Sequence, residues 1–452
     1  MTTEREAATF VARTLQERGH IGVFVGGCVR DLLMGRKPKD YDVATSAKPD
    51  EVESMFAHTI PVGKQFGIIV VVVDGHQIEV ATLRGDGQYT DGRRPDSVHF
   101  VTNLREDAER RDFTMNAMFM DPVTGEIFDY FGGQADIAAG IIRAVGEPAL
   151  RIEEDKLRML RACRFAARYG FEIEPGLRAA IAANARSIHM VSAERIAKEL
   201  EGILTTDSPL IGLDYMMALG LMHEVFPEIV RMKSKEGEQD AIWHPEGNTW
   251  VHTRNVVRGA TGNGFVIVLA ALLHDIGKPD TQKIWPNGGI SNHKHADVGA
   301  EIARKIMNRL KLSNEVTDRV YQLVLMHMVM HDGPKMRAAT LKRLIERPDF
   351  NDLVVLQDAD ARGCDYVGSK SLKAFYAQKV AEFAALENES QRPGAKPLVD
   401  GRVLISLGHK PGPRFKEILE AARDAQDEGV FTDAAAAKAW VESNHPLNQP
   451  VG

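Results

Sequence analysis

The sequence predicts an α+β protein in which a small mixed α/β domain is followed by a predominantly α-helical chain. Runs rich in β-branched residues, such as residues 66–73, are confined to about the first third of the chain. Beyond about residue 150 the strand signal fades, and helical patterns continue nearly to the C-terminus. A chain of 452 residues is expected to form about three domains.

The composition is typical of soluble globular proteins and narrows the classes of function. Apolar residues make up 44% and charged residues 26% of the chain. No apolar run reaches the roughly 18 residues that cross a bilayer, so no membrane partner is expected. A net charge of −7 argues against indiscriminate nucleic-acid binding, which depends on neutralising phosphates. The three cysteines are widely spaced, which indicates neither a disulfide framework nor a zinc site. The N-terminus lacks the pattern of a signal peptide, so the cytoplasm is the expected location.

The N-terminal region predicts a helix, a strand and a phosphate-binding turn. Residues 4–18 have a helical pattern, and the apolar run 21–25 predicts a strand that ends at Gly26 and Gly27. Glycines allow a close approach of backbone to an anion, and the start of the following helix, near Arg30, supplies free N–H groups. This turn is therefore a candidate site for phosphate.

Two aspartates follow in a second strand-like run at residues 40–43. Asp40 and Asp42 stand two residues apart, and alternate strand residues share a face. Mg²⁺ prefers oxygen ligands, commonly one or two carboxylates together with substrate phosphates. We interpret residues 26–42 as a site for a nucleoside triphosphate and its metal ions.

A β-hairpin is predicted next. The β-branched run 66–73 and the alternating run 77–84 flank Asp74-Gly75, which is a strong turn signal. Glu79 lies on the return strand, where it can supply a third carboxylate. The polar, glycine-rich residues 85–95 predict a loop.

The helical part begins with a cationic face. In a helix predicted over residues 151–168, four arginines recur at intervals of three, three and four: Arg158, Arg161, Arg164 and Arg168. A solvated face is one explanation, but an anionic partner would stabilise four adjacent guanidinium groups. Asp155 and Arg158 stand at i and i+3, side by side. The carboxylate can accept from an exocyclic amino group and the guanidinium can donate to a ring nitrogen, which would select cytosine and adenine. Alone, such a pair is usually an intrahelical salt bridge.

Five motifs in order make residues 20 to about 205 resemble class II tRNA nucleotidyltransferases, the CCA-adding enzymes, which are kin of bacterial poly(A) polymerases. The motifs are Gly26-Gly27-x-Val29-Arg30-Asp31 with Asp40-x-Asp42, the loop 86–95, Arg110-Arg111-Asp112-Phe113-Thr114-x-Asn116, Glu154-Asp155-x-x-Arg158 and Glu194-Arg195. The resemblance implies a polymerase-beta-like nucleotidyltransferase head, then a helical neck, body and tail. It implies template-independent addition of C, C and A to the 3′-end of tRNA from CTP and ATP.

The resemblance also assigns roles to residues. Asp40 and Asp42 would bind two Mg²⁺ ions, with Glu79 as a third carboxylate. Asp155 and Arg158 would select the nucleotide. The other nucleotide-binding residues would be Gly26, Gly27, Arg30, Arg111, Asp112, Asn116, Arg161 and Arg164.

Two observations favour a complete CCA-adding enzyme within this group. Residues 61–67 resemble the CCA-adding form, whereas poly(A) polymerases carry a more basic stretch there. The intact loop 86–95 argues against an enzyme that adds only CC. An A-adding enzyme or a poly(A) polymerase stays an alternative.

A second set of residues resembles the HD phosphohydrolase superfamily, which binds divalent metal and activates water. The residues are His252, His274, Asp275 and Asp360, with His295 and His327 as additional candidate ligands and His293 and His331 as bystanders. Imidazole with carboxylate suits Mn²⁺, Ni²⁺ or Co²⁺ better than Mg²⁺. In related enzymes the HD domain has phosphatase and 2′,3′-cyclic phosphodiesterase activity, and whether this one hydrolyses anything is open.

The expected domains are a catalytic head at 1–145, a helical neck and body at 146–240, an HD domain at 241–370 and a helical tail at 371–452. One rival is an HD phosphohydrolase whose head is an inactive RNA-binding module, but the intact Asp40/Asp42 pair argues against it. Another rival is a guanosine-tetraphosphate synthetase/hydrolase. In those enzymes the HD domain precedes the transferase domain, whereas here it follows the head, and the motifs differ. The oligomeric state, the tRNA contacts of the tail and any sharing of the CCA task stay open.

Overall fold

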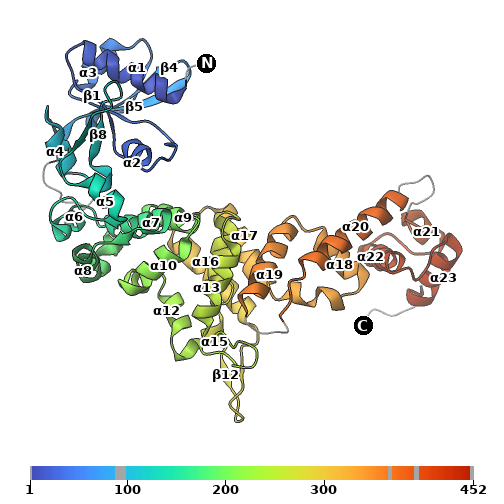
Figure 1. Ribbon diagram of the computed structural model, residues 1–452. Helices are drawn as coiled ribbons and strands as arrows, with labels where there is room; N and C mark the ends of the chain where they lie inside the picture. The colour runs from blue at the N-terminus through green and yellow to red at the C-terminus, as the bar shows by residue number, and fades with distance from the viewer. Residues whose placement is uncertain (1–2, 87–97, 365–368, 391–396, 448–452) are drawn as a thin grey trace. The chain divides into compact units, whose positions relative to one another are not determined.

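The computed structural model of the chain describes residues 3–86, 98–364, 369–390 and 397–447. The chain forms two compact units (Figure 1): unit 1 contains residues 1–234 and 306–313, and unit 2 contains residues 235–305 and 314–452. The predicted α+β class is confirmed, with a mixed α/β head followed by mostly helical chain. The four narrower domains stay predictions.

A seven-stranded mixed sheet forms the centre of unit 1, in the order β3-β4-β5-β2-β1-β8-β9. Its strands are β1 (Gly22–Val25), β2 (Val43–Thr45), β3 (Thr59–Gly63), β4 (Ile68–Val73), β5 (His76–Thr82), β8 (Met118–Met120) and β9 (Ile127–Asp129). Strands β2 and β5 run parallel, whereas the other neighbouring pairs are antiparallel. Strands β6 (Arg84–Asp86) and β7 (Val98–Phe100) pair separately.

The predicted hairpin is present, and its turn has the expected geometry. Strands β4 and β5 pair from Ile68–Ala81 to Val73–His76. Asp74 and Gly75 both have positive φ, 48° and 83°, as a two-residue type I′ turn requires. Most of the predicted loop 85–95 lies outside the described residues.

The prediction of a strand at residues 40–43 is wrong at its start, because β2 begins only at Val43. Asp40 and Asp42 lie in the irregular segment that leads into β2. The N–H group of Val25 in β1 donates to the Asp42 carbonyl at 3.1 Å, which fixes this segment beside the sheet.

Helix α1 (Glu4–Glu17) packs against the sheet. It begins at a capping box between Thr3 and Glu6. Its buried face consists of Ala7, Ala8, Val11, Ala12 and Leu15, spaced for one side of a helix. A Cβ atom added at Gly22 of β1 would lie 2.2 Å from the Ala12 carbonyl oxygen. The small residue therefore permits the close contact of α1 and β1, and the core of unit 1 is built on it.

Helices complete unit 1. Those near the sheet are α2 (Gly27–Leu33), α3 (Pro49–Met55), α4 (Leu104–Glu109) and α5 (Gly133–Ala139). The next are α6 (Pro148–Glu154), α7 (Arg158–Tyr169), α8 (Pro175–Asn184), α9 (Ala193–Leu204), α10 (Pro209–Ala218), α11 (Leu221–Val225) and α12 (Pro227–Lys233). A short parallel pair, β10 (Ile141–Ile142) and β11 (Glu172–Ile173), links the two groups.

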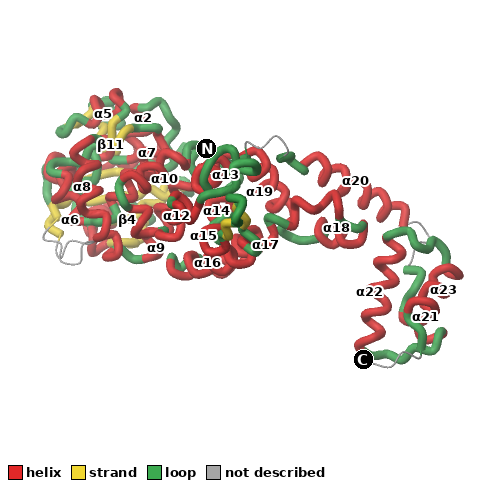
Figure 2. The backbone as a smooth tube through the Cα atoms, turned by 90° about the horizontal axis from the view of Figure 1, so that it is seen from below, coloured by secondary structure: helices red, strands yellow, loops and turns green. Residues whose placement is uncertain are grey.

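Unit 2 is helical apart from the small hairpin of β12 (Lys283–Ile284) and β13 (Ile290–Ser291), as far as its described residues show (Figure 2). Its helices are α13 (Thr249–Ala260), α14 (Phe265–Leu273), α15 (Lys278–Thr281), α16 (His295–Arg309, whose last turn belongs to unit 1), α17 (Asn314–Met326), α18 (Ala338–Ile345), α19 (Phe350–Gly363), α20 (Lys373–Ser390), α21 (Gly401–Ser406), α22 (Pro413–Asp427) and α23 (Ala434–Asn444). Helix α14 is buried over Ile267 to Leu273, as its apolar sequence predicts. Helices α21 to α23 have a small core of their own.

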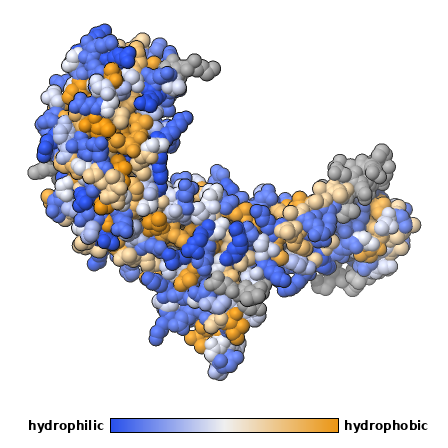
Figure 3. Space-filling model, viewed as in Figure 1, coloured by the Kyte–Doolittle hydropathy of each residue, from blue (hydrophilic) through white to orange (hydrophobic). Residues whose placement is uncertain are grey.

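The surface seen in Figure 3 is mostly polar, with scattered apolar patches. Exposed apolar side chains include Ile284 on the β12–β13 hairpin. Among the described residues no helix combines the length and the apolar character that crossing a membrane requires.

Candidate functional sites in the head and in the histidine cluster

The turn between β1 and α2 depends on glycine. Gly26 has φ of 70°, which favours glycine, and its N–H group donates to the Met118 carbonyl at 3.2 Å. A Cβ atom there would lie 3.2 Å from the guanidinium nitrogen Nη1 of Arg111. Gly27 is the first residue of α2. The turn therefore brings backbone and Arg111 close together, as a phosphate-binding turn needs.

Asp42, directly before β2, and Glu79 in β5 are neighbours. Val43 pairs with Val80, and each carboxylate immediately precedes its member of this pair, so both project on one side. Burial, Glu79 and Asp40 raise the pKa of Asp42 to about 7, although Arg111 lowers it. Partial burial and the Asp40 charge likewise raise the pKa of Glu79. Three predicted carboxylates therefore repel one another in one place, and a cation would stabilise them.

Several predicted nucleotide-binding residues form one buried polar chain. The Arg30 guanidinium donates to Asn116 Oδ1 at 2.5 Å and to Asp31 at 2.8 Å. The Asn116 amide donates to Asp112 Oδ1 at 3.0 Å, and Arg161 Nε donates to Asp112 Oδ2 at 2.8 Å. Although burial opposes ionisation, Arg161 and Asn116 hold the pKa of Asp112 at about 2. This chain fixes α2 and α7 relative to the sheet.

Arg30 is buried against two aromatic rings rather than exposed to solvent. Its side chain is buried, and its guanidinium carbon lies 4.9 Å from the ring centre of Tyr169 and 5.5 Å from that of Phe165. Arg111 is held differently, by an ion pair of 2.8 Å with buried Asp107. Neighbouring side chains thus orient both arginines.

The predicted helix 151–168 is wrong as a single element. Helix α6 ends at Glu154, Asp155 has extended backbone angles, and α7 begins at Arg158. Consequently Asp155 and Arg158 do not form the side-by-side pair expected of i and i+3. The Asp155 carboxylate accepts from Arg195 of α9 at 2.7 Å, whereas Arg158 donates to Glu154 at 2.6 Å and to the Arg110 carbonyl at 2.9 Å.

Three of the four arginines on the predicted cationic face, Arg158, Arg161 and Arg164, are paired within unit 1. Arg161 binds Asp112, and Arg164 binds Glu199 of α9 at 2.6 Å. The Arg164 guanidinium also lies 4.3 Å from the ring centre of Phe165. Intramolecular carboxylates therefore offset much of the repulsion expected along this helix face, and local sequence patterns could not have placed them there because Asp112 and Glu199 lie far away along the chain.

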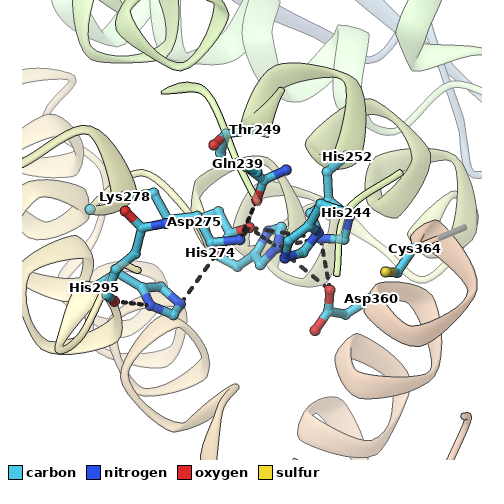
Figure 4. Close-up of polar contacts among 12 residues, drawn as sticks. Gln239, His244, Thr249, His252, His274, Asp275, Lys278, His295, Asp360 and Cys364 are labelled. Carbon is cyan, nitrogen blue, oxygen red and sulfur yellow. Dashed lines mark hydrogen bonds and ion pairs between the residues drawn. The ribbon is translucent and has the colours of Figure 1, made fainter. Parts of the chain in front are cut away.

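In unit 2 the six residues predicted as HD ligands come together (Figure 4). They are His252 in α13, His274 and Asp275 after α14, His295 at the start of α16, His327 after α17, and Asp360 in α19, and Figure 4 labels all of them except His327. All except Asp360 are fully or almost fully buried. Five separate segments thus converge on one cluster, which lies in a cavity of about 350 Å³.

Hydrogen bonds fix which ring nitrogen of each histidine faces the centre. Nδ1 of His274, His295 and His327 lies 2.8, 2.8 and 2.6 Å from a backbone carbonyl oxygen. Carbonyls only accept, so these Nδ1 atoms donate, and in neutral rings the lone pair is on Nε2. Nε2 of His295 and Nε2 of His327 are 3.2 Å apart, and burial with the neighbouring histidines lowers the pKa of His327 to about 3. Facing lone pairs favour a cation between them.

Asp275 lies between two pairs of histidines. Its Oδ2 is 3.2 Å from His274 Nε2 and 3.7 Å from His252 Nε2. Its Oδ1 is 3.3 Å from His295 Nε2 and 3.9 Å from His327 Nε2. Two groups of three candidate ligands therefore share this carboxylate, an arrangement that suits a pair of metal ions.

The sequence interpretation missed three members of this cluster. His331, treated as a bystander, lies 2.9 Å from Asp360 Oδ2, so that treatment is wrong. Lys278 forms an ion pair of 2.7 Å with Asp275; its place after Gly277 was the available signal. Glu246 accepts from His252 Nδ1 at 3.0 Å, and no pattern in the sequence connects these two residues.

Three family models match the chain, two of them within unit 1 and the third mostly within unit 2. The model of the poly A polymerase head domain matches residues 23–143, the model described as "Probable RNA and SrmB-binding site of polymerase A" matches 170–232, and the HD domain model matches 248–362. Nucleotidyltransferase and HD domains generally bind divalent metal ions, and both clusters described above have ligand sets of that kind.

Curated relatives match the N-terminal half. A CCA-adding enzyme of Geobacillus sp. is 44% identical over 236 residues, which are 52% of this chain and 57% of that protein. One of Geobacillus thermodenitrificans is 47% identical over 216 residues, 48% of this chain and 53% of that protein. The chain thus spans little more than half the length of these relatives.

Solved structures match nearly the whole chain. The Bacillus stearothermophilus CCA-adding enzyme in complex with CTP is 28% identical, covers 98% of both chains and has a TM-score of 0.70. The Thermotoga maritima CCA-adding enzyme complexed with tRNA is 19% identical, covers 97% of this chain and 94% of that chain, and has a TM-score of 0.60. The second likeness is one of fold alone.

Proposed function

We propose that this chain is a nucleotidyltransferase of the kind that carries the poly A polymerase head domain, and that it adds C, C and A to the 3′-end of tRNA from CTP and ATP. The observation that carries the proposal is the arrangement of the carboxylates and the glycine turn. Asp42 lies beside Glu79, with Asp40 two residues away, and Gly26 in the turn between β1 and α2 lies next to the Arg111 guanidinium. The likeness to the CTP-bound enzyme over 98% of both chains supports the choice of substrate class.

Asp40 and Asp42 would hold two Mg²⁺ ions, with Glu79 beside them. The raised pKa of Asp42, caused by burial and by neighbouring carboxylates, fits a site at which cations bind. Bound Mg²⁺ would supply activation of the tRNA 3′-hydroxyl and stabilisation of the departing pyrophosphate. Gly26, Gly27 and Arg111 would contact the triphosphate, while Arg30 keeps α2 in position through Asn116 and Asp31.

Asp155 and Arg158 would select the nucleotide. The carboxylate accepts from the amino group that cytosine and adenine share, and the guanidinium donates to the adjacent ring nitrogen. Guanine and uracil would present a carbonyl to Asp155, at a cost of about 1–3 kcal/mol for the unmade hydrogen bond. Arg195 and Glu154 hold the two side chains on the turn between α6 and α7, and Asp112 with Asn116, Arg161 and Arg164 stiffens that side of the site.

The deciding experiment offers tRNA lacking zero, one, two or three terminal nucleotides, with all four NTPs, and sequences the products. CCA addition predicts completion of every shortened end and no further extension. Addition of A alone, or of long A tracts, would replace the proposal by its alternatives. Asp42→Asn should abolish addition while tRNA binding persists, whereas Asp50→Asn on the exposed start of α3 should leave addition unchanged.

A second activity is proposed for the histidine cluster. The convergence of four imidazole Nε2 atoms on Asp275 and Asp360 supports metal-dependent phosphoester hydrolysis, with Mn²⁺, Ni²⁺ or Co²⁺ as the ions that suit imidazole and carboxylate. The test adds each metal and a 2′,3′-cyclic nucleotide. Hydrolysis that disappears in Asp275→Asn supports the proposal; no turnover with bound metal would make the cluster structural.

The cytoplasm is the proposed location and tRNA the proposed partner. None of the three cysteines, which all lie in the described part of the chain, forms a disulfide, and two of them are buried, which suits a reducing compartment. Recognition of tRNA would rest on shape and backbone rather than on net charge.

A further inference from the structure

A third group of metal-ligand side chains lies beside the histidine cluster and shares Glu246 with it. His244 and Glu246 belong to the segment before α13, and Cys364 directly follows α19. One ligand atom from each of these residues lies within 4.8 Å of those from the other two. The three side chains therefore bring nitrogen, oxygen and sulfur donors to one point.

The two oxygens of Glu246 face different partners. Oε1 accepts from Nδ1 of His244 at 2.9 Å and from Nδ1 of His252 at 3.0 Å. Oε2 lies 3.9 Å from the Cys364 sulfur. The carboxylate is almost completely buried, with 1% of its side chain exposed, so its position is set by these neighbours rather than by solvent.

We propose that His244, Glu246 and Cys364 bind a zinc ion. Zinc takes imidazole, carboxylate and thiolate ligands in tetrahedral sites, with bonds of about 2.0–2.3 Å that place neighbouring ligand atoms roughly 3.3–3.8 Å apart. The separations of 2.9 and 3.9 Å lie close to that spacing. A thiolate ligand disfavours Mg²⁺ and distinguishes this site from the all-nitrogen-and-oxygen cluster next to it.

The coordination would be open at one position. His244 and Cys364 both line the cavity that contains the histidine cluster, and Figure 4 shows Cys364 near Asp360. Three protein ligands leave the fourth position for water or for a donor atom of a bound molecule. On binding, the Cys364 thiol would release its proton to solvent. The neutral His244 ring would lose its Nδ1 proton and take one up on Nε2 through solvent, so that Nδ1 changes from a donor to Glu246 into a ligand.

The site would be linked to the histidine cluster through Glu246. The same carboxylate that would bind zinc accepts from His252, and such an outer hydrogen bond orients a ligating histidine. The rival explanation is that Glu246 only orients His252 and that Cys364 is incidental. The two explanations differ in whether a thiolate becomes a ligand.

Cobalt(II) substitution separates these explanations, because only a thiolate ligand gives sulfur-to-cobalt charge-transfer absorption in the near ultraviolet. The full-length wild-type protein, titrated anaerobically with Co²⁺, should develop this band, and excess Zn²⁺ should remove it. Cys364→Ser should lack the band and bind one equivalent of metal fewer. Absence of the band in the wild type, or its persistence in Cys364→Ser, would overturn the proposal.

A matched control variant tests whether the absorption band is specific to Cys364, and an alkylation measurement tests zinc binding without any variant. Cys163→Ala should keep the band, because Cys163 is a buried residue of α7 outside the proposed site. Burial also raises the pKa of its thiol to about 12, so this thiol does not supply a thiolate ligand. In the unmodified protein, Zn²⁺ should slow alkylation of Cys364 at least tenfold, as read by peptide mass spectrometry. Unchanged alkylation with zinc present would contradict the proposal even if a variant failed to fold. Neither readout depends on nucleotide addition or on hydrolysis.

Discussion

Asp42 and Asp112 both lie in unit 1, and their surroundings shift their pKa values in opposite directions. Burial, Glu79 and Asp40 raise the pKa of Asp42 to about 7. Asp112 is buried as well, but Arg161 and Asn116 outweigh that burial and lower its pKa to about 2. The negative charge of Asp42 is not fully offset by any described side chain, which suits metal binding. Asp112, in contrast, forms a structural ion pair with Arg161.

Asp112→Asn should therefore destabilise the fold in a pH-dependent manner. A carboxyl whose pKa is lowered from about 3.9 to about 2 contributes roughly 2 kcal/mol at neutral pH. Because the folded pKa is the lower one, this contribution is complete above pH 4 and disappears as the pH falls toward 2. Urea unfolding of both proteins between pH 7 and pH 3 should show a stability difference that narrows on acidification.

The control for this prediction is Asp332→Asn. Asp332 pairs with Lys335 at 3.0 Å on the surface, and such exposed pairs contribute at most about 1 kcal/mol. Its effect should be small at every pH. A difference for Asp112→Asn that stays constant from pH 7 to pH 3 would mean that the mutation acts through packing rather than through the ion pair.

At the scale of elements, local sequence rules succeeded where the deciding contacts are local. Asp74-Gly75 specifies a type I′ turn through two positive φ angles, so the hairpin of β4 and β5 could be predicted. The break at Asp155 could not, because the partner of that carboxylate is Arg195, 40 residues later. The same limit explains His331, whose contact with Asp360 arises only when α19 packs beside the segment after α17.

Helices α15 and α16 meet at glycine, and this contact places His295 beside Asp275. A Cβ atom on Gly277 would lie 2.2 Å from the His295 carbonyl oxygen and 2.6 Å from the Gly299 nitrogen. Both are backbone atoms, which cannot rotate away. Gly277→Ala should therefore cost about 3 kcal/mol, at the upper end of overpacking, and weaken metal binding by the histidine cluster.

Thermal unfolding and metal titration measure these two effects. Gly412→Ala is the control, because a Cβ atom on Gly412 would meet nothing within 4 Å, and its stability should change by no more than about 0.5 kcal/mol. Gly277→Ala with normal metal affinity would show that α16 can shift without moving His295 out of the cluster.

At the scale of the whole molecule, the two proposed chemistries belong to different compact units. The carboxylates Asp40, Asp42 and Glu79 lie in unit 1, and all six predicted HD ligands lie in unit 2. The polar partners described for the head residues, such as Asp107 and Glu199, are in unit 1 as well. Loss of ligands in one unit should therefore leave the other site intact.

Reciprocal variants test this separation. Asp275→Asn keeps the side-chain shape but removes the carboxylate shared by both groups of histidines, so it should lose metal from unit 2 and retain nucleotide addition within about twofold, a difference of about 0.4 kcal/mol. Asp42→Asn should lose addition and retain the metal content of unit 2. Addition rates and metal equivalents are measured on the same full-length preparations, with circular dichroism to confirm folding. A tenfold fall in addition for folded Asp275→Asn would show that the histidine cluster acts on the head, because none of its ligands belongs to unit 1 and only coupling between the units could carry such an effect.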